Sequence, residues 1–187
     1  MKQAWGTPSM KRELWNREFA EGRWDFIANT SGDAIYGYVE KYCRNGSILD
    51  LGCGSGNTGC ELNIDSYREY TGVDISDVAL RTASERSQTS GRANKNQYVQ
   101  HDIASYSPAR KYRVILFRES IYYIPRIKIK RMLERYARHL EPGGVFIVRW
   151  HDGKVGAQIV DLLEGEFQFL EKHSTPGGPC IVVFRSN

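Results

Sequence analysis

The residues with the clearest chemical meaning form a glycine-rich stretch, Leu49–Gly59, with the sequence LDLGCGSGNTG. This stretch follows a short apolar run, so it is expected to lie where a buried strand ends and a helix begins. Gly52, Gly54 and Gly56 lack a Cβ, which allows a sharp turn and a close approach of a ligand to the backbone. The following helix would begin here, and its free N–H groups and its dipole would place a partial positive charge beside the loop. The stretch therefore predicts a ligand-binding loop.

Two classes of ligand use a loop of this kind. Gly54, Gly56 and Gly59 spell GxGxxG, the fingerprint of dinucleotide binding. Asp50 lies just before the loop, where a carboxylate would repel a pyrophosphate. It would suit a cationic group, such as the ammonium of an amino acid. The loop leaves both classes open, and Asp50 favours the second.

Two further carboxylates follow the next two expected strands. Asp74 comes at the end of the second, where an acidic side chain can accept hydrogen bonds from both hydroxyls of a ribose. Asp102 follows the third and is next to Ile103, so a carboxylate could hold an adenine amino group while an apolar side chain covers the ring. Together with Asp50, these residues suit a ligand that is cationic at one end and adenosyl at the other.

The elements that would position these residues alternate between strand and helix. The expected strands are Ser47–Leu51, Tyr70–Val73, Gln97–Gln100, Arg113–Phe117 and Val145–Trp150, and the expected helices are Pro8–Gly22, Asp33–Tyr42, Ser76–Ser87 and Pro125–Leu140. This alternation predicts an α/β fold with a parallel sheet covered on both faces. A further helix near Gly156–Leu163 precedes two apolar runs, Phe167–Leu170 and Cys180–Phe184, that flank a Pro/Gly turn. They predict a hairpin whose last strand is antiparallel.

At these residues the sequence resembles the class I S-adenosylmethionine-dependent methyltransferases. Five stretches in order carry the resemblance: Leu49–Gly56, Gly72–Ile75, His101–Ile103, Val114–Ser120 and Leu140–Ile147. The resemblance implies a Rossmann-like three-layer sandwich with a seven-stranded, mostly parallel sheet in the order 3-2-1-4-5-7-6 and strand 7 antiparallel. The run Glu119–Tyr123 is more weakly similar to small bacterial sugar-modifying enzymes, such as the nodulation-type N-methyltransferases.

The resemblance also implies a cofactor, S-adenosylmethionine, and its contacts. On the methionine side these are Asp50, Gly52, Cys53, Gly54, Gly56, Phe117 and Arg118. Asp74 would hold the ribose, with Ile75 beside the adenine. Asp102 and Ile103 would hold the adenine edge. The N-terminal aromatic residues Trp15, Phe19, Trp24 and Phe26 are expected to belong to the core or to a cover over the cofactor.

Methyl transfer from a sulfonium is an in-line displacement, so the enzyme mainly has to position the nucleophile. The acceptor is expected beyond the ends of the fourth and fifth strands. The candidate catalytic residues there are Glu119, Tyr122 and His151, which Asp152 follows. His151 has the unperturbed pKa best suited to a base near neutrality. The acceptor atom, oxygen or nitrogen, stays open at this point.

Length and composition limit the other possibilities. The chain has 187 residues, which predicts a single domain, 1–187, with a helical cap over 1–45 and a Rossmann-like core over 46–187. Without a bilayer-length apolar run or a signal-peptide core, we expect a cytoplasmic protein with no membrane partner. The four cysteines form no CxxC, which predicts neither a disulfide framework nor a metal site.

The partners expected from these observations are few. A formal net charge of +4 is too small to argue for nucleic acid. The Asn/Asp-Pro-Pro-aromatic motif of many nucleic-acid and protein methyltransferases is also absent from the fourth strand's end. We therefore expect a small-molecule acceptor and a monomer or homodimer. An RNA or protein methyltransferase, a non-catalytic cofactor sensor and an NAD-dependent oxidoreductase are the alternatives.

Overall fold

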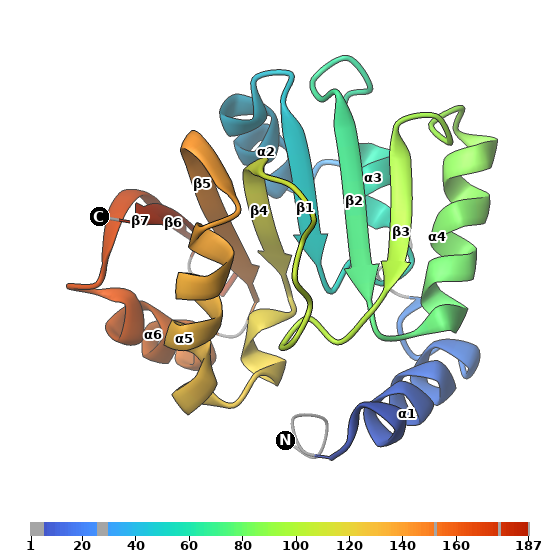
Figure 1. The fold of residues 1–187 in the computed structure, drawn as a ribbon, viewed down its shortest axis with the longest axis horizontal. Helices are drawn as coiled ribbons and strands as arrows, with labels where there is room; N and C mark the ends of the chain where they lie inside the picture. Colours follow the sequence, from blue (N-terminus) through green and yellow to red (C-terminus); the bar gives the residue numbers. More distant parts are fainter. Residues whose placement is uncertain (1–5, 26–29, 152, 176, 187) are drawn as a thin grey trace.

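The computed structural model describes residues 6–25, 30–151, 153–175 and 177–186, with the backbone alone described at 153–155. Its centre is a seven-stranded sheet in the order β3-β2-β1-β4-β5-β7-β6 (Figure 1). Strands β1 to β5 run parallel to one another, whereas β7 is antiparallel to both β5 and β6. The expected strand order and the antiparallel last strand are both confirmed.

The elements lie close to where the apolar pattern predicts them. The strands are β1 (Ser47–Leu51), β2 (Glu69–Asp74), β3 (Asn96–Gln100), β4 (Tyr112–Arg118), β5 (Leu140–Trp150), β6 (Phe167–Ser174) and β7 (Cys180–Ser186). The helices are α1 (Pro8–Ala20), α2 (Ile35–Cys43), α3 (Asn57–Glu61), α4 (Asp77–Thr89), the 3-10 turn η3 (Ile121–Tyr123), α5 (Arg126–Ala137) and α6 (Gly153–Leu163).

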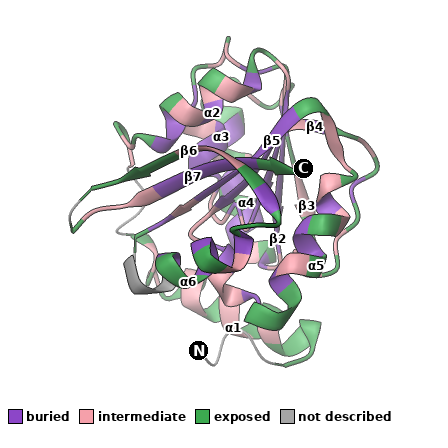
Figure 2. Cartoon of the chain, turned by 90° about the vertical axis from the view of Figure 1, so that its left-hand side faces the viewer, coloured by how far each residue is buried: buried purple, intermediate pink, exposed green. Residues whose placement is uncertain are grey.

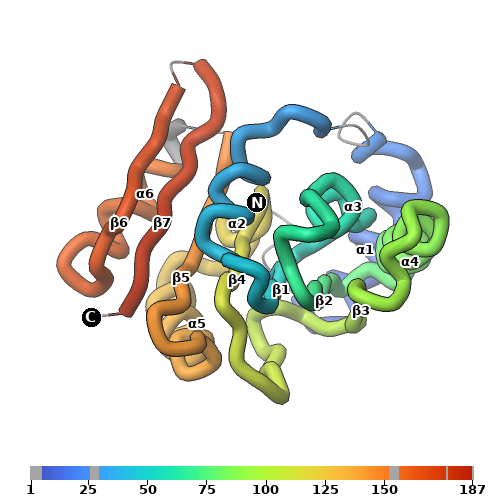
Figure 3. The backbone as a smooth tube through the Cα atoms, turned by 90° about the horizontal axis from the view of Figure 1, so that it is seen from above, coloured from blue at the N-terminus to red at the C-terminus, as the bar shows by residue number. Residues whose placement is uncertain are grey.

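Two apolar layers lie on opposite faces of the sheet. In β4, Ile115 and Phe117 pack towards α5 and α6, whereas Val114 and Leu116 pack towards α2. A strand that is buried on both faces reads as a continuous apolar run, which explains why β4 is evident in the sequence. Figure 2 shows the buried residues concentrated in the strands and on the inward sides of the helices, and Figure 3 shows the helices on either side of the sheet.

Strand β5 begins earlier than its apolar run predicts. The pattern predicts a start at Val145, whereas the strand begins at Leu140, which pairs with Tyr112 before a register shift. The intervening Pro142 and Gly143 are exposed, so no apolar run marks them. The shift lets the apolar parts of β4 and β5 align, and the last pair in their register is Arg118 opposite Arg149.

Helix α1 lies beyond the carboxyl ends of β2 and β3, next to α4 (Figure 1). It has no buried residue of its own. Polar contacts hold it: Asn16 donates to Asp77 at 2.7 Å and accepts from the hydroxyl of Ser76 at 2.7 Å. The helix therefore covers the sheet edge at which the predicted site residues meet. Over the described ranges, none of the helices has the length and apolar character to cross a membrane.

Candidate functional site

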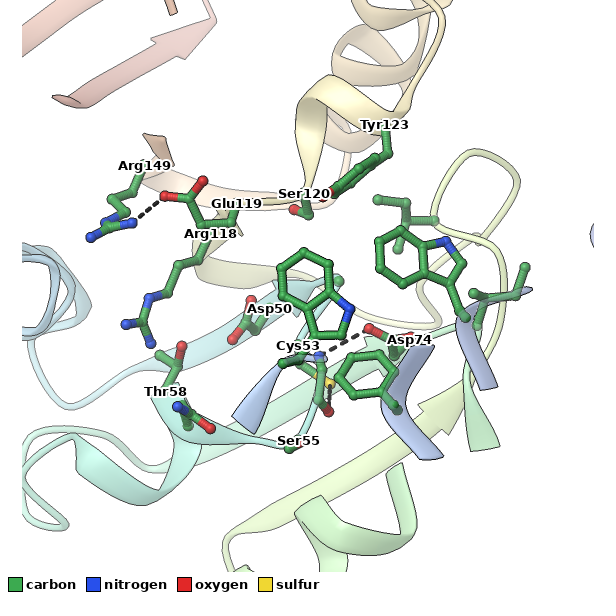
Figure 4. Close-up of a pocket in the computed structure, with 18 of the residues that line it drawn as sticks. Asp50, Cys53, Ser55, Thr58, Asp74, Arg118, Glu119, Ser120, Tyr123 and Arg149 are labelled. Atoms are coloured by element: carbon green, nitrogen blue, oxygen red, sulfur yellow. Dashed lines mark hydrogen bonds and ion pairs between the residues drawn. The ribbon is translucent and has the colours of Figure 1, made fainter. Parts of the chain in front are cut away.

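A pocket lies between α1 and the carboxyl ends of strands β1 to β5 (Figure 4). Most of the residues predicted from the sequence line it: Asp50, Gly52, Cys53, Gly54, Asp74, Ile75, Asp102, Ile103, Arg118 and Glu119. The structure thus brings together predicted residues from four strand ends, and Arg149 adds the end of β5. The parallel sheet explains this, because the carboxyl ends of its strands share one edge.

The three glycines of the loop have different tasks. All three have a positive φ, which L side chains rarely adopt: +84° for Gly52, +52° for Gly54 and +78° for Gly56. A Cβ on Gly52 would lie 2.5 Å from that of Ser120, and one on Gly56 would lie 2.7 Å from that of Ala83. Gly52 and Gly56 therefore allow Ser120 and Ala83 to pack against the loop. Gly54 instead faces the pocket and the ring of Phe19.

Asp74 ties the loop to the end of β2. Its Oδ2 accepts a hydrogen bond from the Gly54 N–H, and its Oδ1 accepts one from the Ser76 N–H, both at 2.9 Å. Burial raises the pKa of this carboxyl, and the two N–H donors oppose that rise. A carboxylate has about four lone-pair positions, so the two oxygens retain acceptor capacity for a ligand.

Asp50 is the most unusual carboxyl group of the pocket. Its side chain is 1% exposed, and burial raises its pKa to about 6, although Tyr70 donates a hydrogen bond to Oδ2 at 2.7 Å. Within the described part of the chain, Oδ1 is buried with no partner at hydrogen-bond distance, although the Thr58 hydroxyl and Arg118 lie near enough to oppose the rise in pKa. An unpartnered buried carboxylate oxygen is costly, and a cationic ligand group would satisfy it. Asp50 therefore fits the ammonium of an amino acid.

Asp102 already has a partner that the sequence does not reveal. Its Oδ2 forms an ion pair with Lys11 Nζ of α1 at 2.9 Å, and its Oδ1 accepts from the Ala104 N–H at 2.9 Å. Lys11 and Asp102 are 91 positions apart, so no local pattern links them. The pair fixes the start of α1 beside Ile103, at the expected adenine end of the pocket.

Aromatic rings from α1, from the turn after it and from η3 complete this side of the pocket. Trp15, Phe19 and Trp24 line it together with Tyr123 of η3. Trp15 and Tyr123 meet edge to face, with their ring centroids 4.9 Å apart. The rings thus contribute to a cover over the pocket, as expected. Phe26, named with them in the sequence, lies outside the described residues.

On the other side of the pocket, four charged side chains form a chain of ion pairs. Asp33 Oδ2 contacts Arg118 Nη2 at 3.1 Å and Arg149 Nη2 at 3.0 Å. Arg149 Nη1 in turn contacts Glu119 Oε1. Tyr122 donates a hydrogen bond to Glu119 Oε2 at 2.7 Å. We define these residues, Asp33, Arg118, Arg149 and Glu119, as the charge ladder (Figure 4 shows its last three).

The sequence predicts two members of the charge ladder and misses the other two. The sequence around Arg149, which directly precedes Trp150, does not mark it as a site residue. Its register partner Arg118 is the only feature that could have pointed to it. Asp33 precedes α2, 85 positions from Arg118, and the sequence alone carries no signal for its role. Burial raises the pKa of Tyr122, and the charge of Glu119 raises it further. Tyr122 is therefore a hydrogen-bond donor here.

Four predicted residues do not line the pocket. Gly56 packs on Ala83, and Phe117 is fully buried in the apolar core. Tyr122 contacts Glu119 through its hydroxyl and does not itself line the pocket. His151 is exposed and is not among the lining residues, and Asp152 lies outside the described residues. The catalytic role of His151 stays a prediction.

The comparison with protein families gives a match over more than half of the chain. The family is described as a methyltransferase domain, and it matches residues 48–144. Trans-aconitate 2-methyltransferase of Rhodopseudomonas palustris (strain HaA2) is 28% identical over 130 residues, which are 68% of this chain and 47% of that protein. Sterol 24-C-methyltransferase of Pneumocystis carinii (strain B80) is 23% identical over 101 residues, 54% of this chain and 26% of that protein. The chain thus spans about half or less of these curated relatives.

Solved structures share the fold over nearly the whole chain. The N-methyltransferase NodS from Bradyrhizobium japonicum WM9, in complex with S-adenosyl-L-homocysteine, has a TM-score of 0.73 and 17% identity, covering 94% of this chain and 97% of NodS. Magnesium protoporphyrin IX methyltransferase from Synechocystis PCC 6803, with bound S-adenosylmethionine, has a TM-score of 0.74 and 17% identity, covering 100% of both chains. These similarities support S-adenosylmethionine as the cofactor. The chain belongs to the methyltransferase-domain family, as its resemblance to the class I S-adenosylmethionine-dependent methyltransferases implies.

Proposed function

We propose that this chain transfers the methyl group of S-adenosylmethionine to an oxygen or nitrogen atom of a small molecule. The observation that carries the proposal is Asp50 Oδ1, a buried and unpartnered carboxylate oxygen in the wall of the pocket. It suits an ammonium and opposes a pyrophosphate, so it favours an amino-acid-bearing adenosyl ligand over NAD. The family match supports the same reaction class.

The pocket residues fit the parts of S-adenosylmethionine in order. Asp50 would bind the α-ammonium, and Arg118, which extends towards Thr58, would bind the α-carboxylate (Figure 4). Asp74 would accept the ribose hydroxyls, while Asp102 and Ile103 would hold the adenine edge.

When it is bound, S-adenosylmethionine supplies a methyl group on a positively charged sulfur. The protein then has to hold the acceptor in line with that methyl group and exclude water. The rings of Trp15 and Tyr123 form part of the cover that would exclude water. The names of two of the similar proteins, which act on trans-aconitate and magnesium protoporphyrin IX, support a small-molecule acceptor.

Titration calorimetry tests the proposed donor. The protein is titrated in turn with S-adenosylmethionine, S-adenosylhomocysteine and NAD. We expect the first two to bind and NAD not to bind. Binding of NAD alone would contradict the proposal and favour an oxidoreductase. Transfer of a labelled methyl group then distinguishes an enzyme from a cofactor sensor, which would bind the donor without turnover.

Asp74→Ala is expected to weaken the binding of S-adenosylmethionine. The variant loses the acceptors for the ribose hydroxyls, and the Gly54 N–H loses its partner at 2.9 Å. We expect a loss of about 1.5–3 kcal/mol in binding free energy, as for hydrogen bonds to a charged group. Calorimetry measures it, and Asp161→Ala, on the exposed side of α6, is the control. Unchanged affinity in a folded Asp74→Ala variant would remove Asp74 from the donor site.

A further inference from the structure

We propose that the acceptor is an amine and that Glu119 is the residue that binds its nitrogen. This inference rests on the proposed methyl transfer and specifies its acceptor. It follows from the charge ladder, from the backbone of Glu119 and from the chemistry of the other groups in the pocket wall.

The charge ladder holds Glu119 in one position. Arg118 and Arg149 are register partners on neighbouring strands, so their positive charges would repel each other without Asp33 between them. Arg149 then pairs with one oxygen of Glu119, and Tyr122 donates to the other. All four charged side chains are largely withdrawn from solvent, and Glu119 is the most exposed, at 25%.

The backbone of Glu119 is also constrained. Its φ is +54°, in the left-handed region that residues other than glycine rarely adopt, and its N–H donates to the Arg149 carbonyl at 2.9 Å. Strain of this kind persists where the surroundings enforce it, and it is frequent at functional sites. Glu119 thus lines the pocket with both oxygens oriented and with lone pairs left for a ligand.

The charges in this part of the pocket disfavour an anionic acceptor. Arg149 is already shared between Asp33 and Glu119, and the charge ladder as a whole is neutral. A carboxylate acceptor would have to approach the negative charge of Glu119. An ammonium would instead be attracted by that charge and could donate hydrogen bonds to its oxygens.

Apart from its carboxylates, the described pocket wall offers no base for a hydroxyl acceptor. Among the described lining residues there is no histidine. Burial raises the pKa of Cys53 and Tyr123, so both remain protonated near neutrality. A hydroxyl needs a base that takes its proton during attack, whereas an amine needs only a neutral lone pair.

The reaction then balances without another reactant. The bound ammonium gives up one proton through Glu119 to solvent. The freed nitrogen lone pair forms the N–C bond to the methyl group. The C–S bond breaks with its electron pair left on sulfur, which becomes a neutral thioether, S-adenosylhomocysteine.

A labelling experiment on the wild-type protein tests the class of acceptor. S-adenosylmethionine with a tritiated methyl group is incubated with the protein and a protein-free metabolite extract. Half of the extract is first treated with acetic anhydride in aqueous bicarbonate, which acetylates amines and spares hydroxyls. We expect the label in the untreated extract to be stable to base, and the treated extract to take up almost none.

Each other outcome overturns the inference. Label that is released as methanol by base would identify a carboxylate acceptor, and base-stable label that survives acetylation would identify a hydroxyl. In both cases methyl transfer would stand and the amine would be wrong. An extract that takes up no label would contradict the proposed small-molecule function, and with it the inference.

Glu119→Gln tests the residue itself. We expect kcat/KM for the labelled acceptor to fall by about 10²–10⁴-fold, the scale for losing a proton-transfer group. The calorimetric affinity for S-adenosylmethionine should stay at the wild-type value. Glu164→Gln, at an exposed position beyond α6, should leave both unchanged. Wild-type turnover by a Glu119→Gln variant that binds the donor normally would exclude Glu119.

Discussion

Asp50→Asn is expected to stabilise the free protein at pH 7 while weakening its binding of S-adenosylmethionine. Burial raises the pKa of Asp50 from 3.8 to about 6, so at pH 7 the folded state carries a charge that it disfavours. A shift of one pKa unit corresponds to 1.36 kcal/mol, so the charged carboxylate lowers the free energy of unfolding at pH 7 by on the order of 3 kcal/mol. Asparagine removes the charge and keeps an oxygen for the Tyr70 hydroxyl.

The sign of the pH dependence follows from the raised pKa. Between about pH 4 and pH 6 the folded state binds more protons at Asp50 than the unfolded state does, so this group lowers stability as the pH rises. The stability difference between Asp50→Asn and wild type should therefore be largest at pH 7 and small near pH 4. Urea denaturation at the two pH values measures it. A variant that is less stable than wild type at pH 7 would contradict the prediction.

The same substitution removes the partner proposed for the donor's ammonium. A hydrogen bond to a charged group is worth about 1.5–3 kcal/mol, so donor affinity should fall by about 10- to 150-fold. Calorimetry with S-adenosylmethionine measures this loss. Unchanged affinity would show that the ammonium does not bind at Asp50. Stability and binding therefore change in opposite directions, which a purely structural role for Asp50 would not produce.

Gly54→Val is expected to weaken donor binding strongly in a protein that still folds. Gly54 has a φ of +52°, and its missing Cβ faces the pocket. Valine adds left-handed strain of about 1–2 kcal/mol and places a branched side chain where the donor must approach the backbone. The expected loss of affinity is about 5- to 150-fold, since overpacking a close contact costs about 1–3 kcal/mol.

Gly91→Val separates the strain from the blocked pocket. Gly91 has a φ of +70° with no atom within 4 Å of an added Cβ, and it lies outside the pocket wall. This control should lose a similar amount of stability and keep full donor affinity. Thermal unfolding and calorimetry on both variants measure the two effects. Normal donor binding by Gly54→Val would show that the loop is only a turn.

The parts of the fold that the sequence predicts are those with local causes. Strand β4 is evident because both of its faces are buried, and the terminal hairpin is evident from its turn. The early start of β5 depends on pairing between Leu140 and Tyr112, which no local run of side chains records. Phe117 illustrates the limit of reading a strand end. It lies next to the pocket residue Arg118, yet the alternation of side chains along β4 directs it into the core.

The residues of the candidate site also divide into those that a local sequence pattern predicts and those that depend on distant contacts. Asp50, Asp74 and Asp102 each lie at the end of their own strand or just after it, so a short motif suffices to find them. The ion pair between Lys11 and Asp102, and the position of Asp33 between two arginines, depend on contacts across 91 and 85 positions. Only the folded chain establishes these contacts, and one sequence carries no pattern for them.

The strand order also places the carboxylates proposed for the donor and the residue proposed for the acceptor in separate stretches of the chain. Strands β1, β2 and β3 form one half of the sheet and carry the carboxylates proposed for the donor, within residues 50–103. Strands β4 and β5 lie beyond β1 and carry the proposed acceptor residues, within 119–149. Acceptor preference can therefore evolve, or be engineered, by exchanging the short segment around η3 while the donor half is inherited intact.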